Sequence, residues 1–139
     1  MEFLHEGKTS KIIQAYFKVY STLGYGFLEK VFENAMLIEL RRMGFDCKSQ
    51  QPVKVFYDNY IVGDYFSDII VDNCIILEIK TREVLRDDDL LQLINYLRAT
   101  SIEVGLLLNF GKKPGFSRKI FTNDRKKRNS DPEDAADGH

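Results

Sequence analysis

Apolar residues at helical spacing predict a helix near the start of the chain. They recur every three or four positions from Ile12 to Leu23 and form a broad apolar face. Thr9 or Ser10 stands before this stretch, and both residue types cap helix N-termini. Gly24 then permits a sharp turn, so we expect the helix to end at about Leu23.

A second run of the same kind predicts a helix over about 27–43. Its apolar positions are Leu28, Val31, Phe32, Ala35, Met36 and Ile38. Because these positions recur at helical spacing, we expect them on the buried face of the helix. Gly44 stands where a C-terminal cap belongs, since glycine adopts the left-handed backbone that ends many helices.

The middle of the chain reads as three strands joined by tight turns. Alternating or continuous apolar residues cover about 52–57, 60–71 and 74–80. The pairs Asp58-Asn59 and Asp72-Asn73 separate these runs, and such pairs favour hairpin turns. We therefore expect three neighbouring strands in one sheet.

A third helix and a buried strand complete the predicted fold. Asp87 can cap a helix that runs to about Ala99, and the continuous apolar run over 102–109 is typical of a buried strand. Residues 116–121 are expected to add an edge strand or a short helix. The order αα-βββ-α-β predicts an α/β protein with a mixed central sheet flanked by helices.

Length and charge indicate one domain with a neutral body. We place this domain in residues 1–121, which hold sixteen basic and sixteen acidic residues. Contact with nucleic acid therefore requires a local patch rather than an overall positive charge. Residues 122–139 contain no large apolar side chain, and we expect them to form a disordered polar tail.

The cysteine pattern and the hydropathy favour a cytoplasmic protein. Cys47 and Cys74 are the only cysteines, and with His5 and His139 at the ends no zinc-ligand spacing exists. We interpret both cysteines as buried thiols in a reducing compartment. We expect neither a signal peptide nor a membrane contact, because the first residues turn polar at once and no apolar run approaches roughly 20 residues.

Two acidic residues and a lysine stand on neighbouring predicted strands. Asp68 lies in the second strand, and the strand period of two puts Glu78 and Lys80 on one face of the third. Carboxylates bind Mg²⁺ or Mn²⁺, and the backbone carbonyl of Ile79 is available as a further ligand. Such a metal polarises a phosphoryl oxygen and lowers the pKa of bound water. Lys80 would add a positive charge beside the attacking water or the developing phosphorane.

The register of the hairpin between these strands tests the metal-site interpretation. With a simple two-residue loop, Asp68 would pair with Leu77 and face away from Glu78. A three-residue loop over 72–74, or an equivalent bulge, pairs Asp68 with Glu78 on one face. The metal-site interpretation therefore predicts the longer loop.

A plainer interpretation of the same residues also exists. Asp68, Glu78 and Lys80 would then lie on a solvated face of a half-exposed sheet and form incidental cross-strand pairs. The flanking runs 69–71 and 75–77 are apolar on both faces, and charges at the ends of such runs often line a cleft. The residues alone leave both interpretations open.

Polar pairs on two predicted helices could extend the site. Glu29 and Glu33 are four residues apart and share a helix face, from which a carboxylate could complete a metal shell or assist the water. Gln92 and Tyr96 share a face of the third helix, where they could hold a phosphate and stack on a base. Each pair is also consistent with a solvated helix surface.

These segments together resemble the PD-(D/E)XK nuclease superfamily and, within it, the small bacterial proteins of the GxxExxY family. The resemblance extends from about Lys11 to about Phe121. It rests on residues 23–32, 62–68, 77–80, 92–97 and 104–111.

The resemblance implies a restriction-endonuclease-like αβββαβ core and a metal-dependent nuclease site. Asp68 and Glu78 match the metal-binding acids, and Lys80 matches the catalytic lysine. The metal would be Mg²⁺ or Mn²⁺.

Three further positions follow from the same resemblance. Glu29 matches the helical glutamate of the first motif, and Gln92 with Tyr96 matches the Gln-x-x-x-Tyr motif of RecB-like nucleases. Phe32 stands where the family has its final tyrosine, which argues against proton transfer at that position and for a packing role.

The main functional hypothesis is a metal-dependent nuclease that hydrolyses DNA phosphodiester bonds and selects DNA structure rather than sequence. Tyr16 and Tyr20 on the first helix are candidates for a homodimer surface, although core packing is the favoured role for both. The alternative is a non-catalytic module that binds nucleic acid or protein, or a subunit that needs a partner. The neutral charge and Phe32 favour that alternative slightly.

Overall fold

Five strands form one mixed sheet with helices on both faces. The computed structural model describes residues 4–126. The strands, in their spatial order, are β1 (Cys47–Tyr57), β2 (Tyr60–Val71), β3 (Ile75–Lys80), β4 (Val104–Phe110) and β5 (Pro114–Ile120). The central pair β3–β4 is parallel, and the other neighbouring pairs are antiparallel. The expected α/β class with a mixed, helix-flanked sheet is confirmed.

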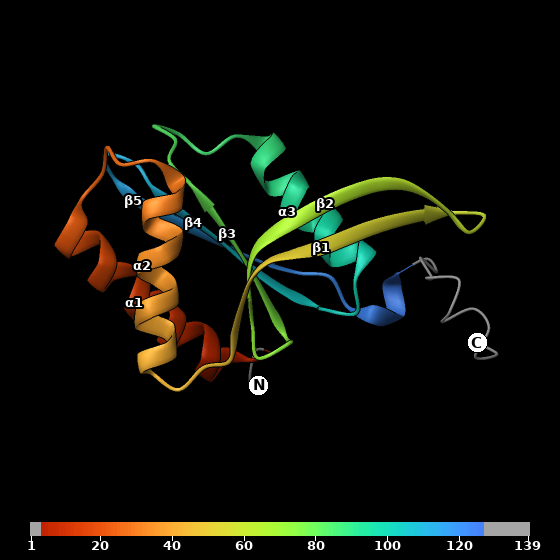
Figure 1. Ribbon diagram of the computed structural model, residues 1–139, viewed down its shortest axis with the longest axis horizontal. Coiled ribbons are helices and arrows are strands. Elements are labelled where there is room, and N and C mark those ends of the chain that lie inside the picture. The colour runs from red at the N-terminus through yellow and green to blue at the C-terminus, as the bar shows by residue number, and fades with distance from the viewer. Residues whose placement is uncertain (1–3, 127–139) are drawn as a thin grey trace.

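Helices cover both faces of the sheet, as Figure 1 shows. They are α1 (Glu6–Leu23), α2 (Glu29–Arg42) and α3 (Asp87–Ala99). One apolar cluster joins α1 and α2 to the face that carries Leu77 and Leu106, and a second joins α3 to the face that carries Ile76 and Leu107. Strands β3 and β4 are therefore buried on both faces, which explains their continuous apolar runs. The parallel pairing follows from α3, which supplies the crossover between them.

Helix α3 lies unusually close to the sheet at Gly105. A Cβ atom at this position would come within 2.6 Å of Cδ1 of Leu93, so only a glycine leaves room for that buried leucine. The close approach fixes α3 against β4 and thereby fixes the polar residues that α3 carries.

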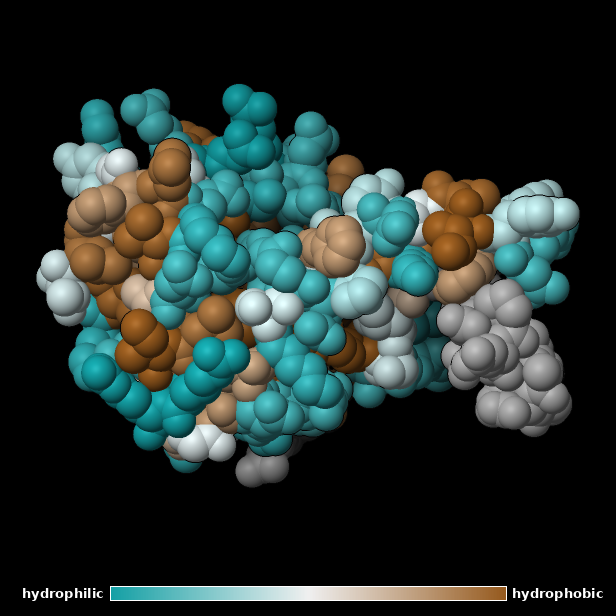
Figure 2. Space-filling model, viewed as in Figure 1, coloured by the Kyte–Doolittle hydropathy of each residue, from teal (hydrophilic) through white to brown (hydrophobic). Residues whose placement is uncertain are grey.

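The predicted buried face of α2 is confirmed only in part. Leu28 is 81% exposed, and Val31 and Ile38 are also exposed, whereas the fully buried apolar side chains include Phe32 and Met36. Both sets of residues recur at helical spacing, so periodicity alone cannot select between them. Figure 2 shows the consequence, a gathering of apolar side chains on the surface over the α1–α2 side of the molecule.

Two predicted helix N-caps were also wrong. Helix α1 begins at Glu6 rather than at a Thr9 or Ser10 cap, and the Thr9 hydroxyl donates to the Glu6 carbonyl within the helix. Helix α3 is capped from inside its first turn, because the Asp89 carboxylate accepts the backbone N–H of Arg86 at 3.0 Å. A cap three residues into the helix leaves the same Asp-rich signature in the sequence as a cap at Asp87.

The two tyrosines of α1 pack inward. Tyr16 is fully buried, its hydroxyl bonds to the carbonyl of Asn109, and burial raises the pKa of this phenol to about 12. The Tyr20 hydroxyl donates to the Gly111 carbonyl at 2.6 Å. The core-packing interpretation is confirmed for Tyr16, and its use as an exposed dimer surface was wrong.

Both hairpin turns form where the sequence predicts them. Asp58 and Asn59 have φ angles of 47° and 68°, as a tight turn with left-handed central residues requires. In the second turn the Cys74 N–H bonds to the Val71 carbonyl at 3.0 Å, and Val71 then pairs with Ile75. Cys74 is thus the extra residue, and the predicted three-residue loop is confirmed.

Strands β2 and β3 separate just beyond this hairpin. Their pairing extends from Val71–Ile75 to Ile69–Leu77, whereas β2 stays paired with β1 as far as Tyr60. We call residues 51–67 the hairpin arm and the point where β2 leaves β3 the fork. Figure 1 shows the hairpin arm crossing α3 and projecting from the body.

The C-terminal end of the described chain differs from the prediction. A tail was expected from Thr122, but residues 123–125 form a 3-10 turn, and Lys126 donates to the carbonyls of Thr100 and Ile102. The rest of that predicted tail lies outside the described residues.

Cys47 and Cys74 are free thiols, and burial raises the pKa of Cys47 to about 11. Within residues 4–126, no helix is long and apolar enough to cross a membrane.

Candidate active site

The fork places Asp68 and Glu78 against each other. The Ile79 N–H donates to Oδ2 of Asp68 at 2.7 Å, and the Asp68 N–H donates to Oε2 of Glu78 at 2.8 Å. Each carboxylate therefore takes a place that a backbone carbonyl would hold if the strands stayed paired. The two acids meet at the fork because the three-residue loop sets their register.

Both carboxylates at the fork resist ionisation. Glu78 is only 3% exposed, and burial, followed by the nearby charge of Asp68, raises its pKa to about 8. Burial also raises the pKa of Asp68, although the bond from Ile79 opposes this, and the charges of Glu33 and Glu29 add to it. The fork thus brings two carboxyl groups together in a dry environment, where a bound cation would favour their ionised forms.

Lys80 is held on the α3 side of the fork by a chain of polar contacts. Its Nζ donates to Oε1 of Gln92 at 3.0 Å, and Nε2 of Gln92 donates to the Tyr96 hydroxyl at 3.1 Å. Tyr96 is itself buried, so the alternative of a solvated helix surface is wrong for this residue, and burial raises its pKa to about 12. Oδ1 of Asp89 lies 4.0 Å from Nζ of Lys80.

A second group of buried polar residues supports Lys80, and the sequence reading missed it. Asp89 forms a two-nitrogen ion pair with Arg82, with contacts of 3.0 to 3.3 Å. Asn109, which pairs with Lys80 across β3 and β4, bonds to the backbone N–H and carbonyl of Arg82 at 2.8 Å each. These bonds fix the loop that leaves β3. The only sequence signal was the presence of a polar residue at the end of the apolar run of β4.

On the α2 side, the two helix glutamates have different environments. Glu33 is 2% exposed, contacts Lys30 and accepts a bond from Nε2 of Gln50 at 2.7 Å. Glu29 is exposed. Both line a cavity of about 230 Å³ that Asp68 and Ile79 also line. The structure therefore brings Glu29 and Glu33 to the fork, with Gln50 as a partner that the sequence did not indicate.

The donor set at the fork fits a divalent metal. Within residues 4–126, no group of three or more His, Cys, Asp and Glu side chains converges as a complete metal cage. Asp68 and Glu78 nevertheless offer two carboxylates, and a bound cation would offset the charge of Asp68, which after burial is the next cause of the raised pKa of Glu78. Mg²⁺ is commonly held by one or two carboxylates with its remaining positions taken by water and phosphate.

Comparison with known proteins identifies the family. The sequence matches the PD-(D/E)XK nuclease superfamily over residues 6–119. The chain belongs to this superfamily. The superfamily match does not reach the finer GxxExxY assignment, which stays a prediction.

One solved structure illustrates the shared fold. The crystal structure of SSO0001 matches with a TM-score of 0.53 and 17% sequence identity, over 87% of this chain. The chain spans 62% of the length of that protein, so the likeness concerns the fold alone. No curated protein matches the sequence.

Phe32 has the packing role that its side chain suggests. It is fully buried and stacks on Phe110, with ring centroids 4.2 Å apart and planes at 15°. Phe32 thus joins α2 to β4.

Proposed function

We propose that this protein is a Mg²⁺- or Mn²⁺-dependent nuclease that hydrolyses phosphodiester bonds of DNA. The observation that carries the proposal is the meeting of Asp68 and Glu78 at the fork, with Lys80 two residues along the same strand. Membership of a nuclease superfamily supports this choice of chemistry.

The metal would be held by Asp68, Glu78 and the backbone carbonyl of Ile79. When bound, it would polarise the phosphoryl oxygen and lower the pKa of a bound water. Asp68 and Glu29 both line the cavity on the α2 side, and Glu29 would accept a proton or orient the water there. The protein thus provides a polar entrance on the α2 side of the fork.

Lys80 acts from the opposite side. Its ammonium group stabilises negative charge that develops on the phosphate, or the hydroxide form of the water. Gln92 holds Lys80 through the 3.0 Å bond, and Tyr96 holds Gln92, so the two α3 residues position the lysine and the adjacent strand of substrate. The neutral charge of residues 1–121 favours selection by DNA structure over tight binding along a duplex.

The experiment is cleavage of single-stranded, duplex, flap and four-way-junction DNA with Mn²⁺ or Mg²⁺. We expect Asp68→Ala and Lys80→Ala to reduce the cleavage rate by at least about 100-fold while circular dichroism stays unchanged. Asp64→Ala is the matched control, because Asp64 is an exposed acid on the same strand as Asp68. Undiminished cleavage by Lys80→Ala would refute its assigned role.

A non-catalytic binding module is the second candidate. Both fork carboxylates already accept backbone hydrogen bonds, and Lys80 already has a partner, so the arrangement is also satisfied without a substrate. Binding of DNA without cleavage of any substrate in the panel, with either metal, would favour this function.

A further inference from the structure

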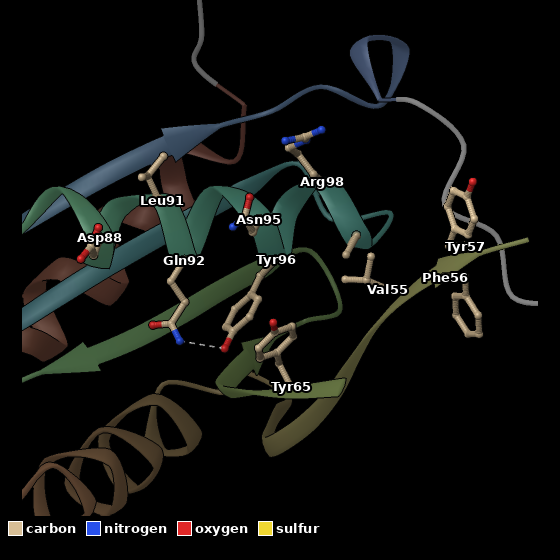
Figure 3. A pocket seen from close by; sticks show the side chains of 11 residues that line it. Val55, Phe56, Tyr57, Tyr65, Asp88, Leu91, Gln92, Asn95, Tyr96 and Arg98 are labelled. Atoms are coloured by element: carbon tan, nitrogen blue, oxygen red, sulfur yellow. Dashed lines mark hydrogen bonds between the residues drawn. The ribbon is translucent and has the colours of Figure 1, made fainter. Parts of the chain in front are cut away.

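A second cavity of about 770 Å³ lies between the hairpin arm and α3. Figure 3 shows side chains from both elements around it. The lining residues that matter here are Tyr57 and Tyr65 from the hairpin arm and Gln92, Asn95, Tyr96 and Arg98 from α3. Gln92 also bonds to Lys80, so this cavity adjoins the proposed site of cleavage.

Tyr65 presents a fixed and accessible aromatic ring to the cavity. Its ring lies 6.0 Å from the ring of Tyr96, between centroids, at an interplanar angle of 44°. A Cβ atom at position 63 would come within 2.9 Å of Cε2 of Tyr65, so the ring lies against the bare backbone of Gly63. Tyr65 is nevertheless 50% exposed. An aromatic ring that is held in place on one side and open on the other is suited to stacking.

The other lining groups match the edges of a nucleobase. Gln92 and Asn95 carry amide groups, which both donate and accept hydrogen bonds. The charged lining residues are one acid, Asp88, and one base, Arg98, so the described cavity has no net charge. A duplex binds mainly through its phosphates and needs a basic surface, whereas an unpaired base offers an apolar face and polar edges.

The size of the cavity agrees with this chemistry. A volume of about 770 Å³ lies within the range of roughly 300–1,000 Å³ that is typical of small-molecule sites. The hairpin arm crosses α3, as Figure 1 shows. Residues of the arm line one side of the cavity, and the buried Tyr96 of α3 also lines it. An extended strand can enter such a space with one or two bases at a time.

We infer that this cavity binds unpaired nucleobases of the strand that is cut, with Tyr65 as the stacking residue. This inference rests on the proposed nuclease function, because it is the bond from Gln92 to Lys80 that connects the cavity to the reacting phosphate. The preferred substrate is then a single-stranded segment, such as a free strand or a flap. DNA and RNA share this chemistry, and both enter the test.

The test measures binding without metal, so that it does not depend on cleavage. Single-stranded DNA, single-stranded RNA and duplex DNA of one sequence are titrated by fluorescence anisotropy, and a 2-aminopurine base reports stacking. Tyr65→Leu keeps an apolar side chain but removes the ring, and Tyr65→Phe keeps the ring. Tyr60→Leu is the matched control, because Tyr60 is 75% exposed on the same strand but lies outside the cavity lining.

We expect the native chain to prefer the single strand over the duplex and to change the 2-aminopurine fluorescence. Tyr65→Leu should weaken single-strand binding by about 5- to 150-fold, whereas Tyr65→Phe and Tyr60→Leu should stay close to native. Because Arg98 is the one basic side chain of the described lining, log K against log salt should have a slope no steeper than about −2.

Three results would overturn the inference. They are a preference for duplex DNA, equal binding by Tyr65→Leu and the native chain, and no binding of any of the three nucleic acids. The proposed function is judged separately, since loss of cleavage in Asp68→Ala would support it even where Tyr65→Leu has no effect.

Discussion

Replacing Glu78 with glutamine is expected to stabilise the metal-free protein at neutral pH. Glu78 is almost fully buried, and its pKa rises from an ordinary value of 4.5 to about 8 on folding. At pH 7 the folded protein must therefore take up a proton that the unfolded chain does not hold. Glutamine avoids that cost, and its carbonyl oxygen can still accept the Asp68 N–H.

The size of the effect follows from the two pKa values. Each pH unit between 4.5 and about 8 costs the folded state about 1.4 kcal/mol, which gives about 3 kcal/mol at pH 7. Below pH 4.5 the group is protonated in both states and contributes no difference. The free energy of unfolding of the native chain should therefore fall as pH rises through this window, and that of Glu78→Gln should fall less steeply. An effect of about 3 kcal/mol is large against a total stability of roughly 5–15 kcal/mol.

The assay is urea denaturation with a chelator at pH 4.5, 6 and 8. Glu83→Gln serves as the control, because Glu83 is a highly exposed glutamate on the loop between β3 and α3. A stability difference between Glu78→Gln and the native chain that is the same at all three pH values would refute the reasoning. Added Mn²⁺ should raise the stability of the native chain more than that of Glu78→Gln, because the ion binds the folded carboxylates.

Two further substitutions test the packing around the site. Phe32→Tyr places a hydroxyl in the buried stack on Phe110. It should lower the free energy of unfolding, measured by urea denaturation, by about 1–3 kcal/mol and leave the cleavage rate unchanged. Increased cleavage would mean that the hydroxyl takes part in the chemistry. Gly105→Ala places a Cβ atom against the buried side chain of Leu93. It should lower the free energy of unfolding by about 1–3 kcal/mol in the same measurement. An unchanged denaturation midpoint would contradict the close contact between α3 and the sheet.

The sequence predicted the parts of the fold that local chemistry determines. The turn pairs at 58–59 and 72–73 have side chains that tolerate a left-handed backbone, and the alternation of the strands fixed which residues share a face. The three-residue loop followed from requiring Asp68 and Glu78 to meet, and the structure has that register. The order of the helices and strands can therefore be predicted from the sequence.

Other features depend on contacts between distant segments. The apolar residues of α2 offer two helical stripes, and only the position of α1 and β3 decides that Phe32 rather than Leu28 is buried. Gln50 lines the cavity at the fork from β1, and Asn109 fixes the loop after β3 from β4, and no short sequence pattern records either position. The cavity beside Tyr65 depends on the course of the hairpin arm across α3, which pairing rules do not define.

The fork makes the length of the hairpin arm independent of the spacing between Asp68 and Glu78. From Ser67 back to Tyr60, β2 pairs with β1, so the hairpin arm is held by its own strand pairing and by its packing on α3. Removing or adding two residues in each strand near the tip would preserve the alternation of faces, whereas a single-residue change would invert it. The hairpin arm can therefore be lengthened or shortened while Asp68 and Glu78 keep their spacing at the fork.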